Sequence, residues 1–395
     1  MSEVWVSRLA ESGITDISMN LCVLSDTIKR HFGDGSKLGA QISYVEEQTP
    51  TGTLGGVCKQ VLGRDAKQVL PTERPPTLPH FSGSTVIAPS GDIVTNFGCD
   101  LLEELYDLHK KAGAALTMVL VPVPWNRRKD FGTVLLRDPQ DCPGALSLQG
   151  AISDFREKDP TSPSNLNNAS IYLIERDFLE LLDDSRTAAD YSLAEPFYDF
   201  GQHVFAAMLG RLPYLSLPAD YLLWGVQYDG HWFDVGNKRD YLRVNRLLLD
   251  GELEIPLPFE ERPWGYVGRE VAMDRSKVTI VPPAIIGNNC VIEPGASIGP
   301  YAVVGDDWVV RSGASVRNSV LWERYSFFTE SGKEIVAADR ALVDRHEILA
   351  GVAVDTCIVV GGTIEESIRE QTLDVLEDGT LRTLPIDYVP EGRRA

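Results

Sequence analysis

An aliphatic residue recurs every six positions towards the C-terminal end of the sequence. The recurring positions are Ile280, Ile286, Ile292, Ile298, Val304, Val310 and Val316. Neither an α-helix nor a flat strand has a period of six residues. A parallel β-helix does, because each six-residue repeat lays one branched side chain inward at a corner of the coil. The sequence therefore predicts a left-handed parallel β-helix of hexapeptide repeats over residues 277–363.

The coil is expected to return once after an interruption. Residues 350–362 echo residues 312–323, so we expect one more turn there, after an excursion over residues 327–341. Such a coil is either a structural, oligomer-forming module or part of an acyltransferase. Acyltransferases of this kind normally carry a catalytic histidine in the coil. The repeats hold none, and His346 is expected in the irregular part, which favours the structural module.

The first 250 residues have a different pattern, in which helical and strand periods alternate. This alternation indicates an α/β fold with a mostly parallel sheet and helices on both of its faces. Two proline-rich stretches, at residues 59–83 and 255–264, are interpreted as a surface excursion and a linker. Helices are expected over residues 4–11, 26–32, 101–111 and 238–249, and strands over 16–23, 41–46, 84–88 and 115–123.

The expected domain organisation follows from these two patterns. An α/β domain spans residues 1–250 and a linker spans 251–276. The β-helix covers 277–363, and residues 364–395 form a C-terminal tail. A chain of 395 residues has room for two such domains.

Charge and cysteine content limit the partners and the compartment. The formal net charge is −20, and such a surface repels nucleic acid and anionic lipid. No apolar run approaches the ~18 residues of a membrane helix, and the first residues do not resemble a signal peptide. The six cysteines are scattered without a C-x-x-C pair, which is typical of buried free thiols in a reducing cytoplasm. We therefore expect a cytoplasmic protein that binds neither nucleic acid nor a membrane.

Two motifs lie where an α/β sheet binds ligands. Residues 49–57, TPTGTLGGV, form a glycine-rich turn that opens a helix, where a ligand can approach free backbone N–H groups. The alternative explanation is an ordinary strand-to-helix turn. Asp92 follows the strand at residues 84–88, and a carboxylate at the carboxyl end of a strand lies at the ligand-binding edge. The alternative is a turn or helix-capping aspartate.

Three further motifs are ambiguous when each is taken alone. Asp234 lies in an aromatic-rich strand, HWFDVGN, and two aspartates on separate strands are a minimal oxygen set for Mg²⁺ bound with substrate phosphates. Its alternative role is to cap the helix that follows. Taken alone, Glu157 and Lys158 most often belong to an exposed charged loop, and Asn168 is usually a turn residue.

The order and spacing of the motifs are more informative than any single one. GTLGG, SGDI, the Phe131–Gly132 pair, the Glu157–Lys158 pair, NASIY and WFDVGN precede the six-residue repeats. This series resembles the sugar-1-phosphate nucleotidyltransferases, and most of all their mannose-1-phosphate guanylyltransferase branch. The resemblance runs from about Leu9 to Val320, and LAESGITDI with HFGDGSKLG adds to it. It implies a Rossmann-like nucleotidyltransferase domain, here with the first strand absent, followed by the β-helix.

The resemblance implies a role for each matching residue. Asp92 and Asp234 match the two magnesium ligands, which are also the catalytic pair. Gly52, Thr53 and Gly55 match the loop that reads the nucleobase. The substrate-binding set implied by the family is Gly52, Thr53, Gly55, Gly91, Gly132, Glu157, Lys158 and Asn168.

The sugar pocket shows two departures from the family pattern. Glu157 matches the carboxylate that binds sugar hydroxyls, Lys158 the amine on the sugar phosphate, and Gly132 and Asn168 other pocket positions. The usual Glu-Lys-Pro is Glu-Lys-Asp-Pro in this sequence, and the usual Asn-Ala-Gly is Asn-Ala-Ser. Because Ser170 replaces that glycine, the resemblance leaves the identity of the sugar open.

The implied reaction is nucleotidyl transfer. A phosphate oxygen of a sugar 1-phosphate attacks the α-phosphorus of a nucleoside triphosphate and releases pyrophosphate. Mg²⁺ and cationic side chains neutralise the charge that grows in the transition state. GTP and mannose 1-phosphate are the favoured substrates, while UTP, dTTP or ATP with glucose 1-phosphate stay open.

One part of the family pattern precedes the region of resemblance. The family normally begins with a strand and a G-x-G-T-R loop, followed by P-K-P, which together hold the triphosphate. We therefore expect that Met1 is not the natural start. The alternative is a non-catalytic regulatory subunit that binds a nucleotide sugar, and a third possibility is a structural β-helix protein. In each case we expect a homo-oligomer, or a complex with a catalytic relative, formed through the β-helix.

Overall fold

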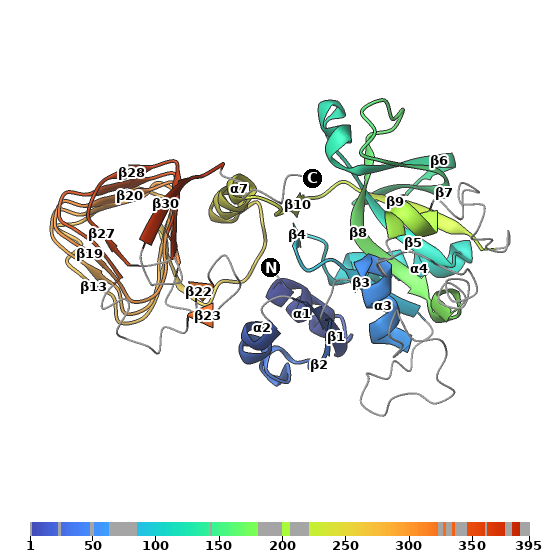
Figure 1. The fold of residues 1–395 in the computed structure, drawn as a ribbon, viewed down its shortest axis with the longest axis horizontal. Helices are drawn as coiled ribbons and strands as arrows, with labels where there is room; N and C mark the ends of the chain where they lie inside the picture. The colour runs from blue at the N-terminus through green and yellow to red at the C-terminus, as the bar shows by residue number, and fades with distance from the viewer. Residues whose placement is uncertain are drawn as a thin grey trace. The chain divides into compact units, whose positions relative to one another are not determined.

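The chain forms two compact units, Met1–Trp232 and Phe233–Ala395, and each is described by itself. Figure 1 shows the elements of both. Most of the predicted excursions over residues 59–83 and 327–341 lies outside the described residues. The structure is a computed structural model that describes residues 2–22, 25–47, 51–62, 85–142, 144–180, 200–205, 221–322, 327–328, 334–335, 346–359, 362–375 and 381–387.

The first unit is built on a six-stranded mixed sheet with the strand order β3-β8-β5-β9-β7-β6. Its strands are β3 (Thr85–Pro89), β5 (Leu116–Pro122), β6 (Gly132–Asp141), β7 (Leu146–Glu157), β8 (Leu166–Glu175) and β9 (Leu223–Tyr228). Only β5 and β9 pair in parallel, and the other described pairs in this sheet are antiparallel. The prediction of a mostly parallel sheet is therefore wrong. The short β6–β7 connection reverses the chain directly, and a connection of that length permits only an antiparallel pair.

A second, two-stranded sheet lies in the same unit. β1 (Asp16–Leu21) pairs in parallel with β2 (Gln41–Glu46) over the full length of both strands. Neither strand pairs with the six-stranded sheet among the described residues. The strands predicted from residues 16, 41, 84 and 115 are confirmed as β1, β2, β3 and β5, with ends that differ by at most two residues.

Helices cover both faces of the six-stranded sheet, as predicted. Leu116, Met118 and Leu120 of β5 pack in a cluster with the helix α3, while Val119 and Val121 of the same strand pack with α1 and α4. This alternation shows that β5 is buried on both faces. The helices are α1 (Ser2–Glu11), α2 (Ser25–Phe32), α3 (Gly52–Leu62) and α4 (Cys99–Ala112), with the shorter turns η1 (Ser36–Leu38), η2 (Trp125–Asp130) and η3 (Phe200–Phe205).

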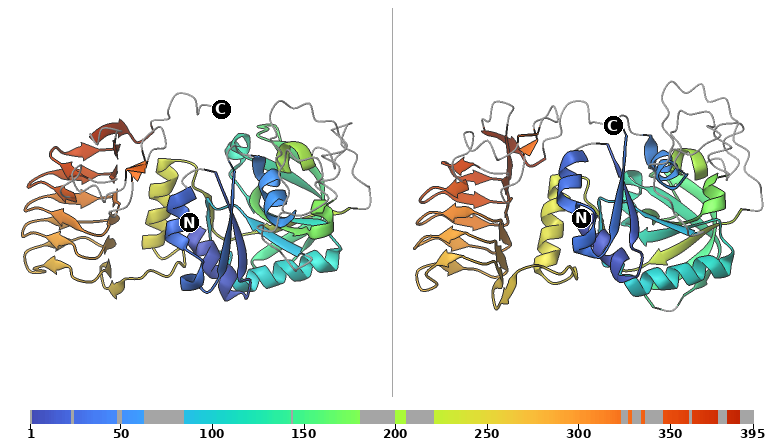
Figure 2. Two further views of the ribbon diagram at one scale, coloured as in Figure 1. Left: turned by 60° about the horizontal axis from the view of Figure 1, so that its bottom comes forward. Right: turned by 90° about the horizontal axis from the view of Figure 1, so that it is seen from below.

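The second unit contains the predicted parallel β-helix. Its short strands stack one above the next, as Figure 2 shows, and pair in parallel along three sheets. Ile280 is partly buried, and the other six repeated aliphatic positions are at most 2% exposed inside the coil. The three sheets contain β12 (Gly265–Val267), β15 (Ala284–Ile286), β18 (Ala302–Val304), β21 (Val320–Leu321) and β26 (Ile358–Val359); β13 (Ala272–Met273), β16 (Val291–Ile292), β19 (Trp308–Val310), β24 (His346–Ile348) and β27 (Thr363–Ile364); and β14 (Thr279–Ile280), β17 (Ser297–Ile298), β20 (Ser315–Arg317), β25 (Ala353–Asp355) and β28 (Ile368–Arg369).

The sharp corners of the coil explain its glycines. Gly299 has a φ of +93°, and a Cβ at this position would lie 1.9 Å from the Val281 carbonyl oxygen. Only glycine adopts this conformation at so close an approach. The glycine that follows the fourth repeated aliphatic residue is therefore required by the turn.

The coil extends further in both directions than the sequence predicts. β11 (Glu260–Arg262), β12 and β13 lie in the segment expected to be a linker, yet they pair with strands of the coil. β29 (Gln371–Val375) continues one sheet and pairs with β30 (Leu381–Pro385) inside the expected tail. These segments lack the six-residue aliphatic period, so the sequence pattern did not include them. α7 (Lys238–Leu249), predicted over the same residues, packs through Leu242 on this unit.

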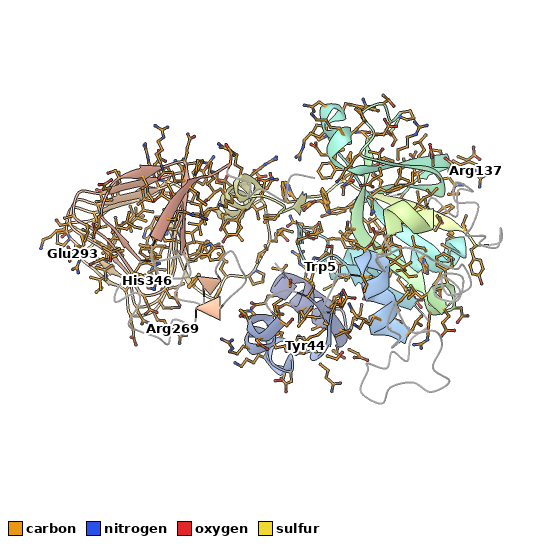
Figure 3. The ribbon with its side chains drawn as sticks, in the orientation of Figure 1. Trp5, Tyr44, Arg137, Arg269, Glu293 and His346 are labelled. Carbon is orange, nitrogen blue, oxygen red and sulfur yellow. The ribbon has the colours of Figure 1, made fainter. Side chains whose placement is uncertain are left out.

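His346 is part of the coil, contrary to the expectation that it lies in an irregular segment. It begins β24, its side chain is buried, and its Nδ1 accepts a hydrogen bond of 3.1 Å from the Gly362 N–H. Its ring lies 5.4 Å from the Trp308 ring, between their centroids. These contacts give His346 a structural role. Figure 3 marks it on the wall of the coil.

The cysteines are free thiols, and one gives a pH prediction. Cys58, Cys290 and Cys357 are buried, and the other three are half-buried. Burial raises the pKa of the Cys290 thiol to about 12, so its reactive thiolate is scarce at pH 8. We expect iodoacetamide to label Cys22 and Cys99 of the native protein at pH 8 and to leave Cys290 unlabelled, as read by peptide mass spectrometry. Equal labelling of Cys290 would contradict its burial.

None of the helices in the described part of the chain is both long enough and apolar enough to cross a membrane.

Candidate functional site

The glycine-rich segment forms the first turns of α3. Thr49 and Pro50 lie outside the described residues, and Gly52, Thr53 and Gly55 are part of the helix. The Thr51 N–H donates a hydrogen bond of 3.3 Å to the buried Glu47 carboxylate, which also accepts from the Thr51 hydroxyl. Glu47 thus caps the N-terminus of α3, where a carboxylate is favoured by the helix dipole.

The glycines of this segment differ in what they face. Gly52 has a φ of +82°, which favours glycine at the start of the helix. A Cβ at Gly55 would lie 2.7 Å from the Thr51 Oγ1, so Gly55 permits the close packing of the capping turn. A Cβ at Gly56 would lie 2.6 Å from the Asn20 Nδ2 of β1. Gly55 therefore has a packing role here, while Gly52 and Thr53 line a cavity.

Asp92 lies in the turn between β3 and β4 (Ile93–Thr95), at the carboxyl end of β3 as the sequence predicts. Its carboxylate is exposed and accepts a hydrogen bond of 2.5 Å from the Ser90 hydroxyl. The Ser90 N–H donates to the Ser170 carbonyl at 2.9 Å, and the Ser2 hydroxyl donates to the Gly91 carbonyl at 3.2 Å. The turn is therefore tied to both β8 and α1, with its carboxylate directed to solvent.

Gly132, Glu157 and Lys158 come together at the ends of β6 and β7. Gly132 is the register partner of Glu157, and a Cβ at Gly132 would lie 2.7 Å from the Glu157 Oε2. The Lys158 N–H donates to the Phe131 carbonyl at 2.9 Å, and both charged side chains are exposed. A carboxylate and an amine thus lie beside each other on one rim of the sheet, and glycine at position 132 leaves room for the carboxylate.

Asn168 is connected to the α3 segment through two aromatic rings. Its Nδ2 donates to the Tyr172 hydroxyl at 2.7 Å, and Tyr172 stacks on Phe200 with 4.8 Å between ring centroids. The Phe200 N–H donates to the Thr53 Oγ1 at 3.1 Å. This chain of contacts joins a predicted sugar position to a predicted nucleobase position. Tyr172 ends the NASIY motif, but no sequence pattern indicates Phe200 or the stack between the two rings, because the contact joins segments far apart in the chain.

Ser170 occupies a conformation that favours glycine. It has a φ of +56°, at an irregularity of β8 where the register with β5 shifts. Its N–H donates to the Asn168 Oδ1 at 3.0 Å, and its carbonyl accepts from the Ser90 N–H. Ser170 thus makes both contacts with its own backbone atoms and not with its hydroxyl group. The departure from the Asn-Ala-Gly pattern therefore adds strain to the turn that holds Asn168.

This strain leads to a stability prediction. We expect Ser170→Gly to raise the free energy of unfolding by about 1 kcal/mol, because it removes the cost of a left-handed conformation for a residue with a Cβ. The matched control, Ser170→Ala, keeps the Cβ and should give no gain. Urea unfolding followed by circular dichroism measures both. A Ser170→Ala variant as stable as Ser170→Gly would show that the hydroxyl, and not the backbone, is the source of the cost.

One cavity, of about 410 Å³, brings part of the predicted set together. Gly52, Thr53 and Gly91 line it, as do Ser170, Tyr172 and Phe200. Asp92, Gly55, Gly132, Glu157, Lys158 and Asn168 are not among its lining residues. The structure therefore places part of the predicted nucleobase loop and part of the aspartate turn at one cavity, and Asn168 contacts this cavity's wall through Tyr172.

Asp234 ends β10 (Trp232–Asp234) and belongs to the second unit, so its joint action with Asp92 stays a prediction. Its alternative role as a helix cap is filled by another residue. The Asn237 Oδ1 accepts a hydrogen bond of 2.9 Å from the Asp240 N–H at the start of α7. Among the described residues, no three or more His, Cys, Asp or Glu side chains are grouped so that they could hold a metal ion.

Several known proteins are similar to this chain in sequence. A UTP–glucose-1-phosphate uridylyltransferase of Synechocystis is 26% identical over 359 residues, which cover 89% of this chain and 82% of that protein. A mannose-1-phosphate guanylyltransferase of Mycobacterium tuberculosis is 27% identical over 294 residues, covering 74% of this chain and 66% of that protein. A glucose-1-phosphate adenylyltransferase of Halalkalibacterium halodurans is 28% identical over 165 residues, covering 42% of this chain and 37% of that protein.

A family match covers the whole first unit and the first residues of the second. Residues 1–251 match the family described as Nucleotidyl transferase, which is more than half of the chain. The similar proteins above are named for three different nucleotides and two different sugars, and all act on a sugar 1-phosphate by name. The chain is therefore a member of the sugar-1-phosphate nucleotidyltransferase family.

Proposed function

We propose that this protein transfers a nucleotidyl group from GTP to mannose 1-phosphate, forming GDP-mannose and pyrophosphate. Family membership supports the transfer to a sugar 1-phosphate. The choice of GTP and mannose rests on the order of the motifs and on similarity to proteins named mannose-1-phosphate guanylyltransferase, of whose length the chain spans about two thirds.

The observation that carries the proposal is the shared cavity. Gly52 and Thr53 at the start of α3 line the same space as Gly91. A nucleotide with its base on α3 would bring its phosphates towards the turn of Asp92. The Thr53–Phe200–Tyr172–Asn168 chain of contacts then leads from the base to the sugar.

The rim of the sheet has the chemistry that a sugar 1-phosphate requires. The Glu157 carboxylate can accept hydrogen bonds from hydroxyl groups, and the Lys158 ammonium can pair with a phosphate. On a chain of formal net charge −20, such a local cation matters because the surrounding field repels the substrate. We propose that this pair holds the sugar 1-phosphate so that its phosphate oxygen faces the α-phosphorus of the nucleotide.

The donor set fits a magnesium ion. Asp92 has an exposed carboxylate at the cavity turn, and hard oxygen ligands shared with substrate phosphates are what Mg²⁺ prefers. We propose that Asp92 and Asp234 hold this ion together with the phosphates. When bound, Mg²⁺ would neutralise the charge that develops as pyrophosphate leaves. The chain's own residues supply orientation, through the Ser90 hydrogen bond on Asp92 and through Lys158.

Charge, cysteine content and the β-helix bear on where the protein lies and with what it assembles. The free cysteines and the acidic surface support a reducing cytoplasm and a partner that is neither nucleic acid nor membrane. The β-helix supports assembly with a second copy or with a catalytic relative.

The proposal is tested by pyrophosphate release from four substrate pairs. The pairs are GTP with mannose 1-phosphate, and UTP, dTTP or ATP with glucose 1-phosphate, each with and without Mg²⁺. We expect release that depends on Mg²⁺ and that is fastest for GTP with mannose 1-phosphate. Faster turnover of another pair would overturn the substrate assignment. Binding of GDP-mannose without any turnover would overturn catalysis and favour a regulatory subunit.

A further inference from the structure

The indole of Trp232 contacts two parts of the candidate site that lie far apart in the sequence. Its Nε1 donates a hydrogen bond of 3.0 Å to the Ala169 carbonyl. Its ring meets the Phe131 ring edge-on, with 5.8 Å between the centroids and 71° between the planes. One half-buried side chain therefore joins two surfaces, which we call the Asn168 turn (residues 168–170) and the lysine rim (Gly132, Glu157 and Lys158).

The Ala169 carbonyl depends on this donor. β8 pairs with β5 at Asn168 and at Tyr172, but the register shifts between the two, so Ala169 lies where the ladder is interrupted. Ala169 is completely buried, and a buried carbonyl without a donor destabilises a fold. The same irregularity holds Ser170 at a positive φ. The indole N–H therefore secures the turn at the point where its backbone is strained.

Phe131 connects the indole to the charged residues of the lysine rim. The Phe131 carbonyl accepts a hydrogen bond of 2.9 Å from the Lys158 N–H, and the Arg127 Cζ lies 5.0 Å from the centre of the Phe131 ring. Gly132, the next residue, is the register partner of Glu157. A shift of Phe131 would therefore move the backbone from which the carboxylate and the amine of the rim project.

The backbone that carries Trp232 is itself fixed beside the aspartate turn. The carbonyl of the preceding residue, His231, accepts a hydrogen bond of 2.7 Å from the Thr95 hydroxyl and one of 3.3 Å from the Asn96 N–H. Thr95 ends β4, which begins directly after Asp92. Because Trp232 projects from this anchored segment, its ring can set the distance between the two surfaces that it contacts.

We propose that Trp232 is a positioning residue, which holds the Asn168 turn and the lysine rim at the separation that lets both bind one sugar 1-phosphate. It acts through its two contacts and not by touching the substrate. This proposal rests on the proposed function, which assigns the sugar to Asn168 and Glu157 and its phosphate to Lys158. Loss of the indole should therefore weaken binding of the sugar and spare binding of the nucleotide, whose base is assigned to α3.

The first test measures hydrogen exchange in the ligand-free protein by peptide mass spectrometry. Trp232→Phe removes the indole N–H and keeps an aromatic ring. Exchange of the Ser170 amide should become about tenfold faster in this variant, while exchange of the Lys158 amide stays unchanged. Trp232→Leu removes both contacts, so both amides should exchange faster.

Trp224→Phe is the matched control for these variants. The Trp224 indole is also half-buried in the first unit, and it donates a hydrogen bond of 3.2 Å to the Gln149 Oε1. The control therefore loses the same kind of donor from another part of the sheet. It should leave exchange at both amides, and the binding of both ligands below, as in the parent protein.

The second test compares a ligand that carries the sugar with one that lacks it. Calorimetry with Mg²⁺ present gives the dissociation constants of GDP-mannose and GDP. Trp232→Phe should weaken binding of GDP-mannose about tenfold and leave binding of GDP unchanged. In turnover, KM for mannose 1-phosphate should rise by the same factor, while KM for GTP should not. A general loss of stability would weaken both ligands alike.

Phe131→Leu tests the ring contact without changing Trp232, and it replaces Trp232→Leu if that variant does not fold. It should speed exchange of the Lys158 amide and weaken GDP-mannose more than GDP.

Two results would overturn the proposal. The first is unchanged exchange of the Ser170 amide in Trp232→Phe, and the second is equal weakening of GDP-mannose and GDP. A parent protein that binds GDP-mannose no better than GDP would instead overturn the proposed function. Exchange in the ligand-free protein would then still decide whether Trp232 fixes the turn.

Discussion

Replacing Asp92 by asparagine is expected to slow pyrophosphate release on the order of 10³-fold, which corresponds to about 4 kcal/mol of lost transition-state stabilisation. Asparagine keeps the shape of the side chain and can still accept the hydrogen bond from Ser90. It lacks the negative charge that holds a divalent cation. Because Asp92 is exposed, the free energy of unfolding should stay within about 0.5 kcal/mol of the parent value.

The matched control is Asp107→Asn, an exposed aspartate on α4 that makes the same change in net charge. It should leave the rate of pyrophosphate release unchanged. Steady-state rates at saturating substrate and Mg²⁺ compare the three proteins. Equal rates for the parent and the Asp92 variant would exclude Asp92 from the site, and equal losses in both variants would show that only the overall charge matters.

Truncating Trp308 to alanine is expected to destabilise the β-helix by about 3–5 kcal/mol, the usual cost of removing a large aromatic side chain from a core. Trp308 is completely buried at the start of β19, and its Nε1 donates to the Trp322 carbonyl at 2.7 Å. Its loss leaves both a cavity and a carbonyl without its donor. Guanidinium unfolding followed by circular dichroism should show the transition of the second unit at lower denaturant.

Trp322→Ala is the control for this prediction, since it makes the same substitution in the same unit at a side chain that is 44% exposed. It should cost less than about 1 kcal/mol. The transition of the first unit should not move in either variant. A Trp322 variant as unstable as the Trp308 variant would mean that burial does not determine the stability of the coil.

The parts of the fold that depend on local sequence were predictable. The inward aliphatic residues of the coil recur because each turn repeats the same local geometry, and Ile298 and Val304 are buried as that period predicts. Strand direction was not predictable, because it depends on pairing between distant segments such as β3 and β8. The first and last turns of the coil were missed because β12, β13 and β29 lack the period and are held by their neighbours.

In the candidate site too, the features that depend on local sequence were predictable and those that depend on distant segments were not. Asp92 was placed correctly at the carboxyl end of a strand, since that position follows from the strand and its turn. The stack of Tyr172 on Phe200 and the left-handed Ser170 came only from the structure. An aromatic contact between distant segments, and a strained turn set by two other strands, leave no periodic signal in a sequence.

A crystal structure of the protein with GDP-mannose and Mg²⁺ tests the central claim most directly. The account predicts that the guanine lies on Gly52 and Thr53, that the diphosphate and the metal lie at Asp92, and that the mannose lies between Asn168 and Glu157. A ligand bound elsewhere, or a metal with no contact to Asp92, would contradict it.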